Sequence, residues 1–189
     1  MDNMETLTFY SGAARGADTY WADALRKRGH NVVEFTPKTL DALSDKEKSD
    51  IEKNYVEVVE LLKRKVLDYD TYAGKLVRRD MMQADDGEAL FAISYLDWSH
   101  NGFVAGGTAY ASTRMILRRK PVYLFDQTKC QWYERDYSIG EHGKFVEIGY
   151  IPKLVDKSTV VGSRDLTEVG KKAIDTVIAT TFNEYDNII

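Results

Sequence analysis

The sequence predicts an α/β fold: a Rossmann-like three-layer sandwich in which helices cover both faces of a mostly parallel sheet. Short apolar runs that are typical of strands alternate with segments in which apolar residues recur every three to four positions, as on one face of a helix. Glycines stand at three of the points where a predicted strand gives way to a helix. The 189 residues contain no linker and no low-complexity segment, so we expect a single domain spanning residues 1–189.

The composition is that of an ordinary globular protein and argues against several classes. Hydrophobic residues make up 43% of the chain and charged residues 30%. The formal net charge of −4 argues against a protein that coats nucleic acid and against a polybasic membrane anchor. Cys130 is the only cysteine, and no apolar run approaches the ~20 residues of a membrane span. We therefore expect a cytoplasmic protein whose partner is neither a membrane nor a nucleic acid.

The first elements have the spacing of a βαβ unit. The apolar run Leu7–Tyr10 predicts a strand, and Ser11-Gly12 ends it abruptly. A helix is predicted from about Ala17 to Arg28, with Gly29 as its C-cap, and a strand follows at residues 31–35. About thirty residues thus hold a strand, a helix and a second strand, which favours parallel pairing.

The middle of the chain continues the alternation. Ser44 and Glu47 have the spacing of a capping box and begin a long helix over residues 45–68, whose length makes it a possible surface for a homo-oligomer. A second helix is predicted over residues 72–84. A buried strand at 89–93, a helix at 109–119 and a strand at 121–125 form the next unit.

The last third adds a hairpin and a third strand–helix unit. Residues 130–151 place two apolar runs on either side of a glycine-bearing tip, which is typical of a small β-hairpin or a covering flap. Residues 158–161 predict a strand, Gly162-Ser163-Arg164 a turn, and residues 165–182 a helix that Asp165 would cap.

The three glycine junctions are expected to form one pocket. In an open parallel sheet, ligands bind beyond the carboxyl ends of the strands, where the strand order reverses. Backbone N–H groups at helix N-termini bind anions such as phosphate. Arg15 and Arg164 are expected to clamp phosphate oxygens, and Asp18 to accept from a ribose hydroxyl. The expected ligand-binding residues are Ser11, Gly12, Ala13, Arg15, Gly16, Asp18, Gly106, Gly107, Thr108, Gly162, Ser163 and Arg164.

Each of these residues also has a purely structural interpretation. A glycine at a strand–helix turn can serve the turn alone, and Thr108 and Ser163 can act only as N-caps. Two aromatic residues near the junctions, Trp98 and Tyr110, are candidates for stacking on a base. Neither the dinucleotide fingerprint nor the P-loop motif occurs. The three histidines (His30, His100 and His142) lack metal-ligand spacing, so we expect no metal and no cofactor.

Ser11-Gly12-Ala13-Ala14-Arg15-Gly16-Ala17-Asp18 resembles the S-G-G-A-R-G-A-D signature of the YspA/DUF2493 group in the SLOG superfamily. That superfamily is Rossmann-like and also contains the Lonely Guy (LOG) phosphoribohydrolases and DprA-type proteins. Residues 78–82 resemble the group's Arg-Asn helix, with Asp80 where Asn is usual, and Gly106-Gly107-Thr108 with Lys120-Pro121-Val122 resembles a further segment.

The segment Val160–Thr167 is similar to a G-S-R-D-L-T segment that opens such proteins, yet it stands near the end of this chain. The resemblance therefore implies a circularly permuted member. It predicts that strand 159–161 lies beside strand 7–10 in the sheet, and that the two ends of the chain come close together.

The resemblance implies a small-molecule nucleotide ligand, such as a nucleoside monophosphate or an ADP-ribose-like molecule, contacted also by Arg78 and Arg79. LOG enzymes cleave the N-glycosidic bond with an Arg and a P-G-G-x-G-T-x-x-E motif, but here Ala111 takes the place of the glutamate. We therefore expect a binding module that acts as a sensor, scavenger or regulator. The alternative is a LOG-like hydrolase with a displaced carboxylate, for which Arg79, Asp80 and Asp97 are the catalytic candidates. A DprA-like single-strand binder fits the net charge poorly.

Overall fold

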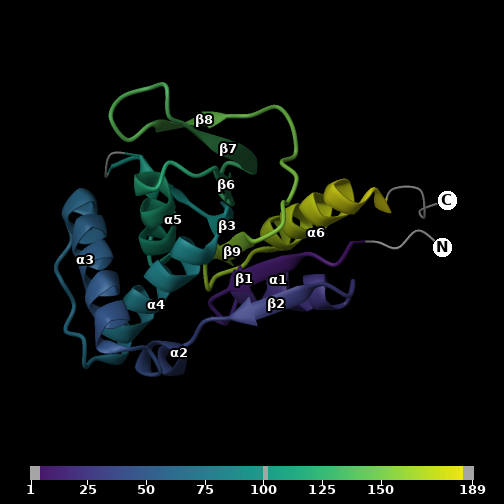
Figure 1. Cartoon of the computed structure of the whole chain (residues 1–189). Helices are drawn as coiled ribbons and strands as arrows, with labels where there is room; N and C mark the ends of the chain where they lie inside the picture. The colour runs from purple at the N-terminus through teal and green to yellow at the C-terminus, as the bar shows by residue number, and fades with distance from the viewer. Residues whose placement is uncertain (1–4, 100–101, 185–189) are drawn as a thin grey trace.

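A computed structural model of the chain describes residues 5–99 and 102–184, and it confirms the α/β fold (Figure 1). Seven strands form one sheet in the order β2-β1-β9-β3-β6-β7-β8. The first five strands in this order pair in parallel, and the last two pairings are antiparallel. The strands are β1 (Thr8–Ser11), β2 (Asn31–Glu34), β3 (Ala89–Ser94), β6 (Val122–Asp126), β7 (Gln131–Asp136), β8 (Lys144–Glu147) and β9 (Ser158–Gly162).

Helices form a layer on each side of this sheet (Figure 1). Alternate residues of β3 show the two layers: Phe91 and Ile93 belong to a buried cluster with Trp21 and Ile174, whereas Leu90 belongs to a second cluster. The first layer consists of α1 (Ala17–Arg26) and α6 (Glu168–Phe182), and the second of α3 (Asp45–Leu62), α4 (Tyr72–Asp86) and α5 (Thr108–Leu117). A short α2 (Pro37–Asp41) follows β2. No helix in the described ranges has the length and apolarity to cross a membrane.

Side-chain caps fix where α3, α4 and α6 begin. The predicted capping box forms at α3, where the Ser44 hydroxyl accepts from Glu47 N and the Glu47 carboxylate accepts from Ser44 N at 2.8 Å. The prediction that Asp165 caps the last helix is wrong, because the Thr167 side chain accepts from Gly170 N and α6 begins at Glu168. Asp165 is thereby left in the loop between β9 and α6.

Strand β9 lies directly beside β1, with Tyr10 opposite Thr159 and Ser11 opposite Val160, so the predicted neighbourhood of these strands is confirmed. If β9 is counted as the first strand, the five parallel strands have the order 3-2-1-4-5 of a doubly wound fold. The described ends of the chain also meet. Leu7 N donates to Nδ1 of His30 at 3.3 Å, and the Phe182 ring stacks on the same imidazole with centroids 4.3 Å apart.

The segment 130–151 contains the predicted hairpin, formed by β7 and β8, but it extends the main sheet rather than covering it, since β7 pairs with β6. Arg135 anchors the hairpin. Its guanidinium lies between the rings of Phe103 and Phe145 and donates to the carbonyls of Gly102 and His142. These contacts join the hairpin to a small antiparallel pair, β4 (Leu96–Asp97) and β5 (Phe103–Val104), which the sequence did not predict.

The apolar face of α3 is used within the chain. Ile51, Tyr55 and Val58 are buried in the cluster that also holds residues of α4 and α5. The apolar side chains that recur along α3 pack against α4 and α5. A homo-oligomer through this helix would therefore have to use its other face, and it stays a prediction.

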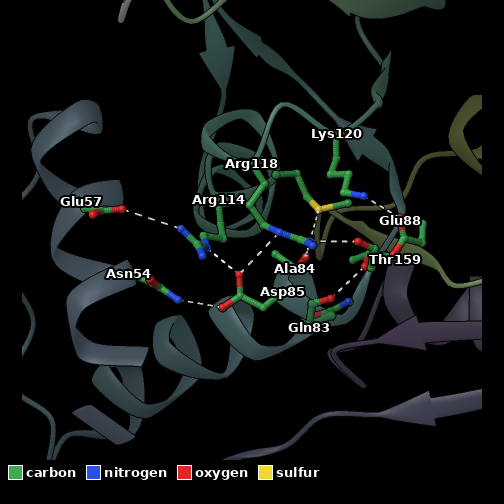
Figure 2. A network of polar contacts seen from close by, with 12 residues as sticks. Asn54, Glu57, Gln83, Ala84, Asp85, Glu88, Arg114, Arg118, Lys120 and Thr159 are labelled. Atoms are coloured by element: carbon green, nitrogen blue, oxygen red, sulfur yellow. Dashed lines mark hydrogen bonds and ion pairs between the residues drawn. The ribbon is translucent and has the colours of Figure 1, made fainter. Parts of the chain in front are cut away.

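A polar network fixes α3, α4 and α5 relative to one another (Figure 2). Asp85 of α4 accepts from Nε of Arg114 on α5 at 2.6 Å and from Nδ2 of Asn54 on α3 at 2.8 Å. Arg118 of α5 donates to the carbonyls of Ala84 and Gly87 at the end of α4. Because α4 and α5 begin beside the carboxyl edge of the sheet, this network sets where their N-terminal ends lie.

Asp85→Ala should lower the free energy of unfolding by about 2 kcal/mol, because it leaves a largely buried guanidinium and an amide without their shared acceptor. Chemical denaturation measures the change. The neighbouring exposed carboxylate provides a matched control: Asp86→Ala should cost less than about 0.5 kcal/mol. Equal losses in the two variants would contradict the role of the network.

Candidate functional site

A cleft of about 570 Å³ lies at the carboxyl ends of β9 and β3. In the doubly wound order this is where the helices diverge to opposite faces, and ligands bind at such switch points. All three predicted glycine junctions contribute to its walls. They supply Ala14 and Asp18; Gly106, Gly107 and Thr108; and Gly162, Ser163 and Arg164.

One face of α4 forms a further wall of the cleft, and of the residues in this wall the sequence predicted only Arg79 and Asp80 as site residues. Ala73, Leu76, Val77 and Asp80 line the cleft with the spacing of one helical face, together with Arg79. Ser94, the last residue of β3, and Tyr95, directly after it, also line the cleft. The signal for these residues was present: polar residues that follow a buried parallel strand, and an apolar stripe of period 3.6 on the preceding helix.

Arg79 joins α4 to the ends of two strands. Its Nη1 donates to the carbonyls of Gly12, after β1, and of Phe35, after β2, and its Nη2 lies 3.0 Å from Oδ1 of Asp80. Its Nε donates to the Leu76 carbonyl at 3.4 Å. Most of the guanidinium is therefore committed to the protein, so Arg79 positions the cleft rather than serving as a free anion clamp.

Asp18 closes the other side of this cluster. The carboxyl is 5% exposed, and its Oδ1 accepts from Gly162 N at 3.0 Å, which ties α1 to the end of β9. A Cβ on Gly12 would lie 2.5 Å from Nη1 of Arg79 and 2.6 Å from Oδ2 of Asp18. Gly12 is thus required because the Arg79 and Asp18 side chains occupy the space a larger residue would need.

Burial raises the pKa of both carboxyl groups, Asp18 and Asp80, toward neutral pH. Burial raises the pKa of Asp18 to about 7, with the Arg79 charge opposing the shift and the Asp80 charge adding to it. Burial also raises the pKa of Asp80 to about 6, again against the effect of Arg79. The two groups titrate as a pair around one cation. Paired carboxyls with raised pKa values in a cleft are characteristic of functional sites.

The N-terminus of α5 opens into the cleft without a side-chain cap. Gly107 occupies the N-cap position and no side chain accepts from the first turn, whereas α3, α4 and α6 are capped by Ser44, Thr71 and Thr167. No atom lies within 4 Å of the position that a Cβ on Gly107 would take. The N–H groups of Ala109 and Tyr110 donate to the carbonyls of Gly106 and Gly107. The donors that remain for an anion are the N–H groups of Gly106, Gly107 and Thr108, at the positive end of the helix dipole.

The N-terminus of α1 differs, since it is packed against the loop after β9. Gly16 has φ of 93°, and a Cβ there would lie 2.5 Å from the carbonyl oxygens of Ser163 and Arg164. Ala17 N donates to the Ser163 carbonyl at 3.0 Å. This junction locks two loops together. Ser11, whose buried hydroxyl donates to the Asp18 carbonyl, likewise supports the turn.

Some predicted ligand residues lie outside the cleft. Ala13 and Arg15 are exposed and are absent from its lining. Arg78 is 2% exposed, pairs with Glu52 and lies over the ring of Tyr55. Its side chain therefore packs within the helix layer and does not reach the cleft. Its neighbour Arg79 points the other way.

The two aromatic candidates and Asp97 are also placed elsewhere. Trp98 is 61% exposed and contacts Tyr133 edge-on, whereas Tyr110 is 8% exposed and packs beneath the Arg64 guanidinium. Asp97 lines a separate pocket of about 160 Å³. The structure therefore brings Arg79 and Asp80 into the cleft but not the third catalytic candidate.

Within residues 5–99 and 102–184, no group of three or more His, Cys, Asp or Glu side chains is arranged to hold a metal ion. His100 lies outside those ranges.

Asp18→Asn should change how stability depends on pH. The folded pKa of about 7 exceeds the ordinary aspartate pKa of 3.8, so the folded state binds the proton more tightly and wild-type stability falls as pH rises from about 4 to about 7. The amide carries no such dependence. From pH 5 to pH 8, the melting temperature of the variant should therefore rise relative to wild type by about 3 °C or more.

Asp165→Asn, which removes an exposed carboxylate from the same cleft, is the control and should show a constant difference from wild type. A constant difference for Asp18→Asn as well would contradict the raised pKa.

Comparison with models of protein families, with curated proteins and with solved structures finds no match to this chain. The resemblance to the SLOG superfamily therefore rests on the sequence motifs alone.

Proposed function

We propose that the cleft binds a nucleotide or nucleotide derivative, such as a nucleoside monophosphate or an ADP-ribose-like molecule, and that the protein acts as a sensor, scavenger or regulatory module. One observation carries the proposal. The uncapped N-terminus of α5 opens into a cleft that the apolar side chains of Ala73, Leu76 and Val77 of α4 also line, so an anionic group and an apolar ring each have a matching surface.

The phosphate binds at Gly106, Gly107 and Thr108. Their backbone N–H groups and the helix dipole supply the positive end, and the Thr108 hydroxyl adds a side-chain donor. Arg164 lines the same cleft, and its guanidinium forms no hydrogen bond or ion pair with the described residues. The Arg164 guanidinium is therefore available for a second contact to phosphate oxygens. The Arg79 guanidinium is not, because it is already bonded to the protein.

The base and ribose occupy the rest of the cleft. Ala73, Leu76 and Val77 offer an apolar surface to a ring, and Asp18 and Asp80 offer acceptors to ribose hydroxyls. The volume of about 570 Å³ lies within the range of small-molecule pockets. The resemblance of residues 11–18 to a nucleotide-binding superfamily supports the same ligand class.

A second candidate function, cleavage of an N-glycosidic bond, is favoured by the Asp18–Asp80 pair. With pKa values of about 7 and about 6, the pair can hold one proton between them near neutral pH. The protonated carboxyl donates this proton to the departing base, and the ionised one stabilises the positive charge that develops on the ribose. Water then bonds to C1′ of the ribose through its oxygen, and its proton passes to the carboxylate that protonated the base, which restores the pair. Ala111 lies in the first turn of α5 and lines the cleft, but its methyl group can take no part in the proton transfer.

Gly107→Asp should weaken binding of the best-binding nucleotide at least about tenfold relative to Gly107→Asn. Both side chains fit, because the position has φ of −68° and open space around its Cβ, but only the carboxylate repels a phosphate at the helix N-terminus. Titration calorimetry with nucleoside 5′-monophosphates and ADP-ribose measures the affinities. Equal affinities in the two variants would show that the phosphate does not bind at α5.

Asp80→Asn tests the hydrolase. If wild type releases free base from the bound nucleotide, the variant should release it at least about 100-fold more slowly, because it cannot exchange a proton, while binding changes little. Chromatography of the incubated nucleotide measures the product, and a melting curve checks that Arg79 still holds the fold. If wild type binds the nucleotide but leaves it intact, the hydrolase function is ruled out and only the binding function remains.

A further inference from the structure

Tyr72 is the most exposed of the large hydrophobic side chains in the described chain, at 70%. It is the first residue of α4, and the residue that follows it, Ala73, lines the cleft. Within residues 5–99 and 102–184, the side chain of Tyr72 makes neither a hydrogen bond nor a ring contact. The fold therefore leaves an aromatic ring unused at the edge of the candidate site.

Helical geometry places Tyr72 on the cleft side of α4. Each residue turns an α-helix by about 100°, so Tyr72 falls between Arg79 and Leu76 in angular position. Both of these line the cleft, as does Asp80 on the next turn. Tyr72 thus continues the lining face one turn beyond Leu76.

The position along the helix places Tyr72 at the mouth. Arg79 meets the carbonyls that follow β1 and β2, so it marks the level of the carboxyl edge of the sheet. The seven residues before it, at 1.5 Å each, rise about 10 Å above that edge. Leu76, which lines the cleft, lies one helical turn or about 6 Å below Tyr72, so a ring that rests on Leu76 is adjacent to the turn that carries Tyr72.

The backbone of Tyr72 is pinned although its ring is free. The Thr71 hydroxyl caps α4 by accepting from Gly74 N, and Gly74 packs against the Asp68 carbonyl so closely that a side chain has no room. A ring on a fixed backbone loses little conformational freedom when it binds, which makes it an effective stacking surface.

We propose that Tyr72 stacks on the base of the bound ligand, so that the cleft selects a base-bearing nucleotide over a bare sugar phosphate; this inference rests on the proposed nucleotide binding. Tyr72 lies just beyond the residues that line the cleft, next to Ala73. Trp98 and Tyr110, the aromatic residues that the sequence favoured for this role, are held by other contacts: Trp98 meets Tyr133 edge-on, and Tyr110 is 8% exposed beneath the Arg64 guanidinium. Base–aromatic stacking tolerates any base, because every base has a π-face.

Titration calorimetry with two probes tests the inference. The first is whichever of adenosine, guanosine, cytidine and uridine 5′-monophosphate or ADP-ribose binds wild type most tightly, and the second is ribose 5-phosphate, which has no base. Tyr72→Ala should weaken the first about tenfold and leave the second unchanged. Tyr72→Phe, which keeps the ring, should bind both as wild type does. Trp98→Ala, which removes another exposed aromatic side chain that does not line the cleft, should also match wild type.

The outcomes separate this inference from the function on which it rests. Unchanged nucleotide affinity in Tyr72→Ala, with weakened binding in Gly107→Asp, overturns the role of Tyr72 and leaves nucleotide binding in place. An equal loss of affinity for the nucleotide and for ribose 5-phosphate also overturns it, because the Tyr72 ring would then not contact the base. Failure of every probe to bind wild type overturns both proposals.

Discussion

The buried guanidinium of Arg79 is the constraint on which the candidate site depends. A buried cation is tolerated only when its donors are bonded and its charge is balanced, and here carbonyls after β1 and β2 and the Asp80 carboxylate meet those needs. The same contacts hold α4 against the carboxyl edge of the sheet, with its N-terminal turns standing above that edge. They also leave no space for a side chain on Gly12. The cleft is thus the gap between a helix that Arg79 fixes and the loops that follow β9 and β3.

The distribution of charge in the cleft follows from this arrangement. Two carboxyls share one cation on the floor, so an anionic group gains little there. The uncapped start of α5 offers the opposite sign on another wall, and Ala73, Leu76 and Val77 of α4 offer an apolar surface. A nucleotide has a part that matches each surface: an anion, a hydroxyl-bearing sugar and a flat ring. The geometry therefore favours one orientation of such a ligand, with its sugar over Asp18 and Asp80.

The sequence predicted what depends on local pattern and missed what depends on packing. The strand–helix spacing and the glycine junctions were sufficient for the fold and for the meeting of the three loops, because parallel strands bring their carboxyl ends to one edge. Arg78 and Arg79 show the limit. The two are alike in sequence, but one step along a helix turns the side chain by about 100°, and only tertiary contacts decide which of them reaches the cleft. Trp98 was misplaced because the β4–β5 pair that carries it has too few residues to leave a pattern.

Because β9 lies in the middle of the sheet, the site forms only when segments from the beginning and the end of the sequence pack together. This strand comes late in the sequence but lies in the middle of the sheet, between β1 and β3. Asp18 accepts from Gly162 N and Ala17 N donates to the Ser163 carbonyl, so loops about 145 residues apart hold each other in position. The cleft wall formed by Gly162, Ser163 and Arg164 exists only when both ends of the chain have folded together. A ligand that binds this cleft therefore stabilises the native state as a unit, since no fragment that lacks β9 retains the complete site.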